Sequence, residues 1–122
     1  MAGQSGIQKV LVAVYILKVK PELVEQVCEI LTMVTSRTQV KPGCIRSSIW
    51  ISPERTELMV PEIWRNRTDH KRHLTSEVYR KLLAGLEMSS EAPLVCFSEC
   101  HGDNGIEMVR TMLERDSWLS EE

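Results

Sequence analysis

The chain has 122 residues, 43% hydrophobic and 26% charged, which suits one domain with a real core and argues against wholesale disorder. Its formal net charge of -2 lacks the basic excess of a nucleic-acid-binding protein. The longest apolar run, residues 10–17, is much shorter than the roughly 20 residues that a membrane helix needs. Residues 1–9 carry no targeting signal. We therefore expect a single cytoplasmic domain over residues 1–122, without a nucleic-acid or membrane partner.

The first two expected elements are a strand and a helix. Residues 8–18 predict a strand that is apolar on both faces, one of which carries Val10, Val12, Val14 and Ile16. Residues 21–40 predict a helix, because apolar side chains recur at helical spacing after Pro21, which suits the first helical position. Pro42 and Gly43 then end the helix and turn the chain.

A hairpin is expected next. Residues 44–52 alternate apolar and polar side chains, and residues 57–66 form a second run of strand-forming residues after a short turn at 53–55. Pro61 lies inside that second run and cannot donate a backbone hydrogen bond. It therefore predicts a bulge or a locally unpaired stretch in the hairpin.

The rest of the chain predicts a helix, a strand and a tail. Residues 68–88 have a helical pattern, with Ser76 as a plausible cap of the main segment. Residues 93–101 predict the last strand, and residues 102–105 a turn. Apolar side chains at helical spacing in residues 106–114 predict a short docking helix, with a frayed, acidic end as the alternative.

The order β-α-β-β-α-β is that of a ferredoxin-like α+β fold, an antiparallel sheet with both helices on one face. We expect its core in residues 8–101 and a C-terminal extension in residues 102–122. Two helices cover one face of the sheet and leave the second apolar face of the first strand exposed to water. At about 25 cal/mol per Å² of exposed apolar surface, this exposure is unfavourable by several kcal/mol. A homodimer packed sheet against sheet removes this exposure, and the tail folding over the same face is the competing solution.

A motif in the second half of the chain points to a family. A Glu-x-Trp sequence ends the third expected strand and a His-x-x-Ser sequence follows nine residues after the Trp, which gives Glu62, Trp64, His73 and Ser76. Over residues 8–101 the chain resembles the antibiotic biosynthesis monooxygenase family, which is quinol-monooxygenase-like and belongs to the dimeric α+β barrel superfamily. The turn that begins at Lys41 also resembles the family's turn, although Lys41 stands where the family usually has an acidic residue.

The resemblance implies a monooxygenase that needs no cofactor and uses dioxygen on a small electron-rich aromatic substrate, such as a quinol. Other members of the family degrade haem, but the position expected to supply their axial histidine falls near Leu83, and leucine cannot ligate iron. We expect no metal either. Cys96 and Cys100 lie four residues apart beside His101 without a second well-spaced pair, so reduced thiols are expected there.

His73 is the expected catalytic base. It stands at the family's histidine position, and an imidazole that titrates near pH 6.5 can take and return a proton. The alternative is that His73 caps or braces the start of the helix. His70, one helical turn earlier, is expected to be exposed, as are the basic residues around it, Arg65, Arg67, Lys71 and Arg72.

The expected substrate-binding residues are Trp64, Glu62, Trp50 and Tyr15. Glu62 and Trp64 share a strand face because they are two residues apart. Trp64 is a pocket wall or a core residue, and Glu62 pairs with a base, orients a side chain such as Arg46, or is a plain surface carboxylate. Tyr15 and Trp50 line the same cavity or the dimer interface.

Three functions remain open at this point. The first is a cofactor-independent, quinol-type monooxygenase with His73 as base. The second is a dimeric module of the same fold that binds or isomerises a small aromatic or carbonyl compound without oxygen. The third is a structural or interaction protein whose pocket is filled by side chains. An open cavity at His73 distinguishes the first two from the third, and oxygen dependence distinguishes the first from the second.

Overall fold

The computed structural model describes residues 9–101, so the expected turn and helix in residues 102–122 lie outside the described residues. The strands are β1 (Lys9–Lys18), β2 (Cys44–Ser47), β3 (Trp50–Ile51), β4 (Glu57–Trp64) and β5 (Leu94–His101). The helices are the short 3₁₀ helix η2 (Pro21–Leu23), α1 (Val24–Gln39), α2 (Arg67–Leu74) and α3 (Glu77–Leu86). No helix within these residues is long and apolar enough to span a bilayer.

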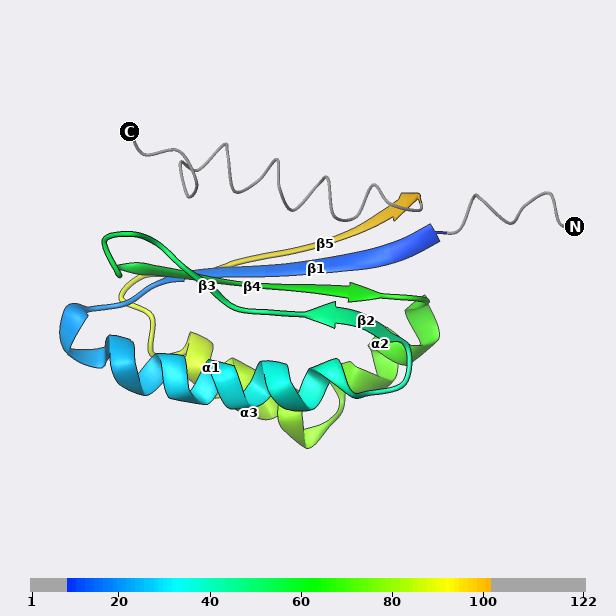
Figure 1. Cartoon of the computed structure of the whole chain (residues 1–122), viewed down its shortest axis with the longest axis horizontal. Coiled ribbons are helices and arrows are strands. Elements are labelled where there is room, and N and C mark those ends of the chain that lie inside the picture. Colours follow the sequence, from blue (N-terminus) through cyan, green and yellow to red (C-terminus); the bar gives the residue numbers. More distant parts are fainter. Residues whose placement is uncertain (1–8, 102–122) are drawn as a thin grey trace, which may run out of the picture.

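The strands form one antiparallel sheet in the order β2-β4-β1-β5, and β3 also pairs with β4. Strand β1 is central, and its Val14 pairs with Pro61 of β4 on one side and with Cys96 of β5 on the other. All three α-helices lie on the same side of the sheet (Figure 1). The arrangement is the ferredoxin-like α+β fold that the sequence predicts.

The main core lies between this sheet and helices α1 and α3. Helix α1 buries an apolar stripe at helical spacing, and β1 and β4 contribute every second side chain, which places Ala13, Tyr15, Leu17, Leu58 and Val60 against the helices. Full burial of each large aliphatic side chain contributes about 1.5–3 kcal/mol. Gly85 lets α3 approach α1, because a Cβ there would lie 3.2 Å from Leu31 Cδ2.

The opposite face of the sheet carries a second apolar cluster, formed by Val10, Val12, Val14, Met59 and Ile63. These side chains alternate along β1 and β4 with those of the main core. The sequence pattern of two apolar faces is therefore confirmed for β1. The homodimer expected to cover this second face stays a prediction.

The hairpin is less regular than the sequence suggests. The strand expected over residues 44–52 is split into β2 and β3, and the gap between them lies opposite Pro61 and Val60 of β4. Proline lacks the amide hydrogen that a continuous ladder needs, so the expected irregularity at Pro61 is confirmed. Ser48 keeps one contact across the gap, from its amide to the Pro61 carbonyl over 3.2 Å.

The helix expected over residues 68–88 is also two helices, α2 and α3. Ser76 has an extended backbone, with φ -88° and ψ 164°, and its side chain accepts the amide hydrogen of Tyr79. It therefore caps α3, as the sequence predicts. Asn66 caps α2 in the same way by accepting from the amide of Asp69 over 2.8 Å. The break at residues 75–76 positions α2 for the site described next.

Candidate functional site

Strand β4 places an acidic and an aromatic side chain under the helices. Glu62 and Trp64 both point toward the helical side of the sheet, since they lie two residues apart on one strand. The indole Nε1–H of Trp64 donates to Glu62 Oε1 over 2.9 Å. Both residues are 0% exposed, so the interpretation of Glu62 as a surface carboxylate is wrong. Arg46 is exposed on β2, and within residues 9–101 its side chain forms no hydrogen bond or ion pair with Glu62, so the partner of Glu62 comes from elsewhere.

Helix α2 supplies that partner. The side chain of His73 is closed to solvent, and its Nε2 lies 3.6 Å from Glu62 Oε2. Its ring packs on Trp64 with centroids 4.8 Å apart and planes inclined by 33°. His73 lies in the last turn of α2, and its carbonyl accepts from the amide and the hydroxyl of Ser76, so the backbone of His73 also braces the start of α3. The contact with Glu62 is the base–carboxylate pairing that the sequence left open.

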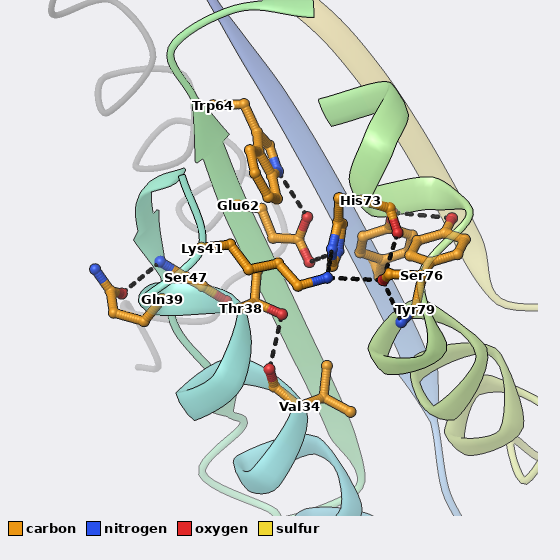
Figure 2. Close-up of polar contacts among 11 residues, drawn as sticks. Val34, Thr38, Gln39, Lys41, Ser47, Glu62, Trp64, His73, Ser76 and Tyr79 are labelled. Atoms are coloured by element: carbon orange, nitrogen blue, oxygen red, sulfur yellow. Dashed lines mark hydrogen bonds and ion pairs between the residues drawn. The ribbon is translucent and has the colours of Figure 1, made fainter. Parts of the chain in front are cut away.

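A lysine reaches the other side of the His73 ring from the turn between α1 and β2. Lys41 Nζ lies 3.0 Å from His73 Nδ1 and 2.7 Å from Ser76 Oγ (Figure 2). An ammonium group only donates hydrogen bonds, so beside charged Lys41 the Nδ1 atom is the acceptor and Nε2 carries the proton. That proton then faces the carboxylate of Glu62, which stabilises this tautomer.

The turn that carries Lys41 depends on Gly43. Gly43 has φ +85°, and a Cβ at this position would overlap the side chain of Asp69 on α2. Its carbonyl accepts the amide hydrogen of Arg65 over 2.7 Å, which fixes the turn to the end of β4. Glycine is therefore required both by the left-handed backbone and by the close approach of α2.

Ser76 connects the site to the start of α3. Its hydroxyl accepts from Lys41 Nζ and from the Tyr79 amide, and it donates to the His73 carbonyl over 2.7 Å. One donor and two acceptor positions are thus all used. Lys41, Ser76 and Tyr79 are partly exposed, whereas Glu62 and His73 are closed to solvent, so Lys41 and its neighbours form the outer layer of the cluster.

Two tyrosines extend the cluster along the sheet. The Tyr15 hydroxyl donates to the Tyr79 hydroxyl over 3.1 Å, and the Tyr79 ring meets His73 edge-on at 5.3 Å. Burial, followed by the nearby Glu62 charge, raises the pKa of Tyr15 far above its ordinary value, so Tyr15 stays protonated. Tyr15 is therefore one side chain away from His73 rather than in contact with it.

His70 is not exposed, contrary to the sequence expectation. It is 2% exposed and lies between Trp64, at 5.7 Å, and Phe97 of β5, at 5.0 Å between ring centroids. Burial lowers its pKa, the negative charge of Glu62 opposes this shift, and the neighbouring His73 adds to it. The spacing of the two histidines could have indicated this burial, because His70 and His73 are three residues apart and share one helical face.

Trp50 lies apart from this cluster. It is 40% exposed on β3, where it pairs with Met59. The basic residues Arg65, Arg67, Lys71 and Arg72 are exposed, as expected. The structure therefore brings together Glu62, Trp64 and His73, and leaves Trp50 elsewhere on the sheet.

Side chains pack closely around His73. None of the three hollows described for residues 9–101 is lined by His73, Glu62 or Trp64. Within the same residues, no three His, Cys, Asp or Glu side chains are grouped to hold a metal ion. What the arrangement offers chemically is a proton acceptor between an ammonium and a carboxylate, beside a buried indole.

Sequence reasoning missed Lys41, Ser76 and Tyr79 as neighbours of His73. The position of Lys41 where the family usually has an acidic residue was a signal that a charge there matters. Ser76 and Tyr79 lie three residues apart, which is the spacing between an N-cap residue and the amide from which its side chain accepts a hydrogen bond. Their contacts with His73 and Lys41, however, depend on how α2 and α3 pack. That packing has no local signature in the sequence.

The chain was compared with known proteins. The family model described as antibiotic biosynthesis monooxygenase matches residues 10–85. No curated protein matches the chain in sequence.

Similar solved structures include a candidate antibiotic biosynthesis monooxygenase from Nitrosomonas europaea, with 20% identity, TM-score 0.66, and coverage of 73% of this chain and 88% of that one. A conserved protein from Methanosarcina mazei is 19% identical, with TM-score 0.68 and coverage of 80% and 97%. A protein from Shewanella oneidensis is 18% identical, with TM-score 0.68 and coverage of 78% and 95%. These likenesses show the fold, and the match over residues 10–85 shows that the chain belongs to the antibiotic biosynthesis monooxygenase family.

Proposed function

We propose that the chain is a cofactor-independent monooxygenase of a small, electron-rich aromatic substrate of the quinol type. The observation that carries the proposal is the setting of His73, whose Nδ1 faces Lys41 Nζ at 3.0 Å and whose Nε2 faces Glu62 Oε2 at 3.6 Å. A histidine with one nitrogen beside a carboxylate and the other facing a hydrogen-bond donor resembles the arrangement of a general base.

The first step is removal of a hydroxyl proton from the substrate. The substrate hydroxyl takes the place of the Lys41 ammonium at His73 Nδ1, and this nitrogen accepts the proton. Glu62 then faces an imidazolium, which its carboxylate stabilises. The displaced ammonium of Lys41 remains near the phenolate oxygen and stabilises the negative charge that develops there.

The second step uses dioxygen as the oxidant. The phenolate gives one electron to dioxygen, and the two radicals combine at a ring carbon to form a hydroperoxide. Loss of water from this hydroperoxide leaves a carbonyl. For hydroquinone, the balanced outcome is one hydroxybenzoquinone and one water from one hydroquinone and one dioxygen. All electrons come from the substrate, so the reaction needs no reductant.

None of the three hollows described for residues 9–101 is lined by His73, so the proposal requires the neighbours of His73 to open a path to it. His73 is closed to solvent, but Lys41 in front of it is partly exposed. Rotation of the Lys41 side chain opens the way to Nδ1 without moving a helix. In the proposal, the indole of Trp64 backs the imidazole of His73 from the buried side, since the two ring centroids lie 4.8 Å apart.

The working unit in this proposal is a cytoplasmic homodimer. The apolar cluster of Val10, Val12, Val14, Met59 and Ile63 supports it, because a second copy packed on this face removes apolar area from water.

The test is oxygen uptake by metal-stripped protein with a panel of hydroquinones, compared for wild type and His73→Gln. We expect uptake that survives chelation and falls tenfold or more in the variant, which is about 1.4 kcal/mol in the barrier. The matched control is His70→Gln, a buried histidine of the same helix with no contact to Lys41, which should keep uptake within about threefold of wild type.

Uptake no faster than spontaneous oxidation would contradict the monooxygenase. Conversion of the substrate under nitrogen would instead support the module that binds or isomerises a carbonyl compound without oxygen.

A further inference from the structure

The setting of Lys41 is unusual for a lysine. Its Nζ contacts two groups that carry no negative charge, His73 Nδ1 at 3.0 Å and Ser76 Oγ at 2.7 Å. Among residues 9–101, no carboxylate lies within 4.0 Å of this ammonium. Lys18, by contrast, pairs with Glu91 at 3.4 Å and with Glu57 at 3.7 Å. Lys41 is therefore held in place by partners that do not require its charge.

The surroundings of Lys41 make the loss of its proton easier than for an exposed lysine. Burial lowers the pKa of Lys41, while the charges of Glu62 and of Cys44, when ionised, oppose this effect. Burial also raises the pKa of Cys44 to about 11, so this thiol stays neutral near pH 7 and does not hold the ammonium in its charged form. Glu62 is then the one nearby negative charge, and it faces Lys41 across the His73 ring.

His73 is positioned to accept the proton that Lys41 loses. The three groups form a row in the order nucleophile, base and carboxylate. Lys41 Nζ lies 3.0 Å from His73 Nδ1, and His73 Nε2 lies 3.6 Å from Glu62 Oε2. The same order activates the nucleophile in serine hydrolases, where the carboxylate orients the imidazole and stabilises the imidazolium. Figure 2 shows the lysine side chain pointing at the imidazole. Lys41 is also the partly exposed member of the three, so a ligand meets the amine first.

We propose that Lys41 is a nucleophilic lysine that forms a Schiff base with a small aromatic aldehyde or ketone, with His73 as its base and Glu62 as the group that positions His73. The ammonium gives a proton to His73 Nδ1, and the amine adds to the carbonyl carbon to form a carbinolamine. The imidazolium returns the proton to the carbinolamine hydroxyl, water leaves, and a C=N bond remains. The step consumes no oxygen and needs no cofactor, so it stands independently of the monooxygenase proposed above.

The test is trapping of the imine in the full chain. Wild-type protein is mixed with benzaldehyde at pH 7.5, reduced with borohydride, and mapped by peptide mass spectrometry. Lys71 and Lys81 are exposed lysines in the same molecule and serve as internal controls. An ordinary lysine, with a pKa of about 10.4, is only about 0.1% neutral at this pH. We expect at least tenfold more reduced adduct at Lys41 than at either control, and equal occupancy would overturn the proposal.

Two further measurements test the mechanism. In wild type, the labelling rate of Lys41 should reach half its maximum at a lower pH than the rates of Lys71 and Lys81, which requires no variant to fold. In His73→Gln, labelling of Lys41 should fall at least fivefold while the two controls stay unchanged. Undiminished labelling of Lys41 in a folded variant would show that His73 is not its base. Identical pH profiles for all three lysines would overturn the proposal that Lys41 is a nucleophile.

Discussion

Trp64 donates its indole hydrogen to Glu62 Oε1 over 2.9 Å, and both side chains are 0% exposed. The indole is thus the fixed donor that makes a buried carboxylate tolerable under the helices, and the second carboxylate oxygen is left facing His73. A buried acceptor that loses its partner costs much more than an exposed one.

The first prediction concerns this hydrogen bond. Trp64→Phe keeps an aromatic ring but leaves Glu62 Oε1 without its donor, so we expect the free energy of unfolding to fall by about 2 kcal/mol or more. Urea denaturation measures this change. The control is Val40→Ala, where the side chain is 80% exposed and the expected change is within about 0.5 kcal/mol. Equal losses in the two variants would contradict the role given to the indole.

The second prediction concerns pH. Burial lowers the pKa of His70 in the folded chain, whereas in the unfolded chain it titrates near 6.5. Below this pH the unfolded chain binds a proton that the folded chain does not, so His70 makes the protein less stable as pH falls. The slope is at most about 1.4 kcal/mol per pH unit, and above pH 7 the contribution is constant.

His70→Phe tests this dependence, because phenylalanine retains packing against Trp64 and Phe97 and cannot titrate. Urea unfolding at pH 7.5, 6.5 and 5.5 should show a smaller loss of stability in the variant than in wild type. The same loss in both proteins would assign the acid sensitivity to other groups.

The third prediction concerns the turn before β2. Gly43→Ala places a Cβ against Asp69 and keeps a backbone with φ +85°, which side chains disfavour by about 1–2 kcal/mol. We expect a loss of about 2 kcal/mol or more and a fall in Tm of about 6 °C or more. Pro42→Ala, one residue away and exposed, should cost less than about 1 kcal/mol. An unchanged Tm in Gly43→Ala would mean that the turn and α2 are not in contact.

The fourth prediction concerns Cys44, whose pKa burial raises to about 11. At pH 8.5 less than about 1% of this thiol is ionised, compared with about half of an ordinary thiol. Iodoacetamide should therefore alkylate Cys44 at least tenfold more slowly than it alkylates glutathione at this pH. The rate at Cys44 should continue to rise up to about pH 11, as measured by mass spectrometry, and a plateau near pH 9 would refute the shift.

Local patterns in the sequence predict much of the fold. The alternation along residues 10–17 predicts β1 and its two faces, and Ser76 is identified as a cap from its position before an apolar helical stripe. Glu62 and Trp64 share a face because a strand repeats every two residues. These features depend on neighbours within a few positions, so one sequence is enough to find them.

The parts that the sequence does not predict depend on contacts between distant segments. Lys41 meets His73 across 32 positions, and the contact exists only because α2 is packed against the turn at Gly43. The burial of His70 depends on Phe97 in β5, the last strand. Trp50 resembled a pocket residue because aromatic residues are scarce, but the short strand β3 places it at the surface.

Ser76 carries one further consequence. A single hydroxyl begins α3, accepts from Lys41 and donates to the backbone of His73. The start of α3 and the side chain of Lys41 therefore cannot be adjusted independently, since a substitution at Ser76 changes the stability of α3 and the position of Lys41 together. Ser76→Ala would therefore remove the side-chain cap of α3 and the hydroxyl contact to Lys41 in a single change.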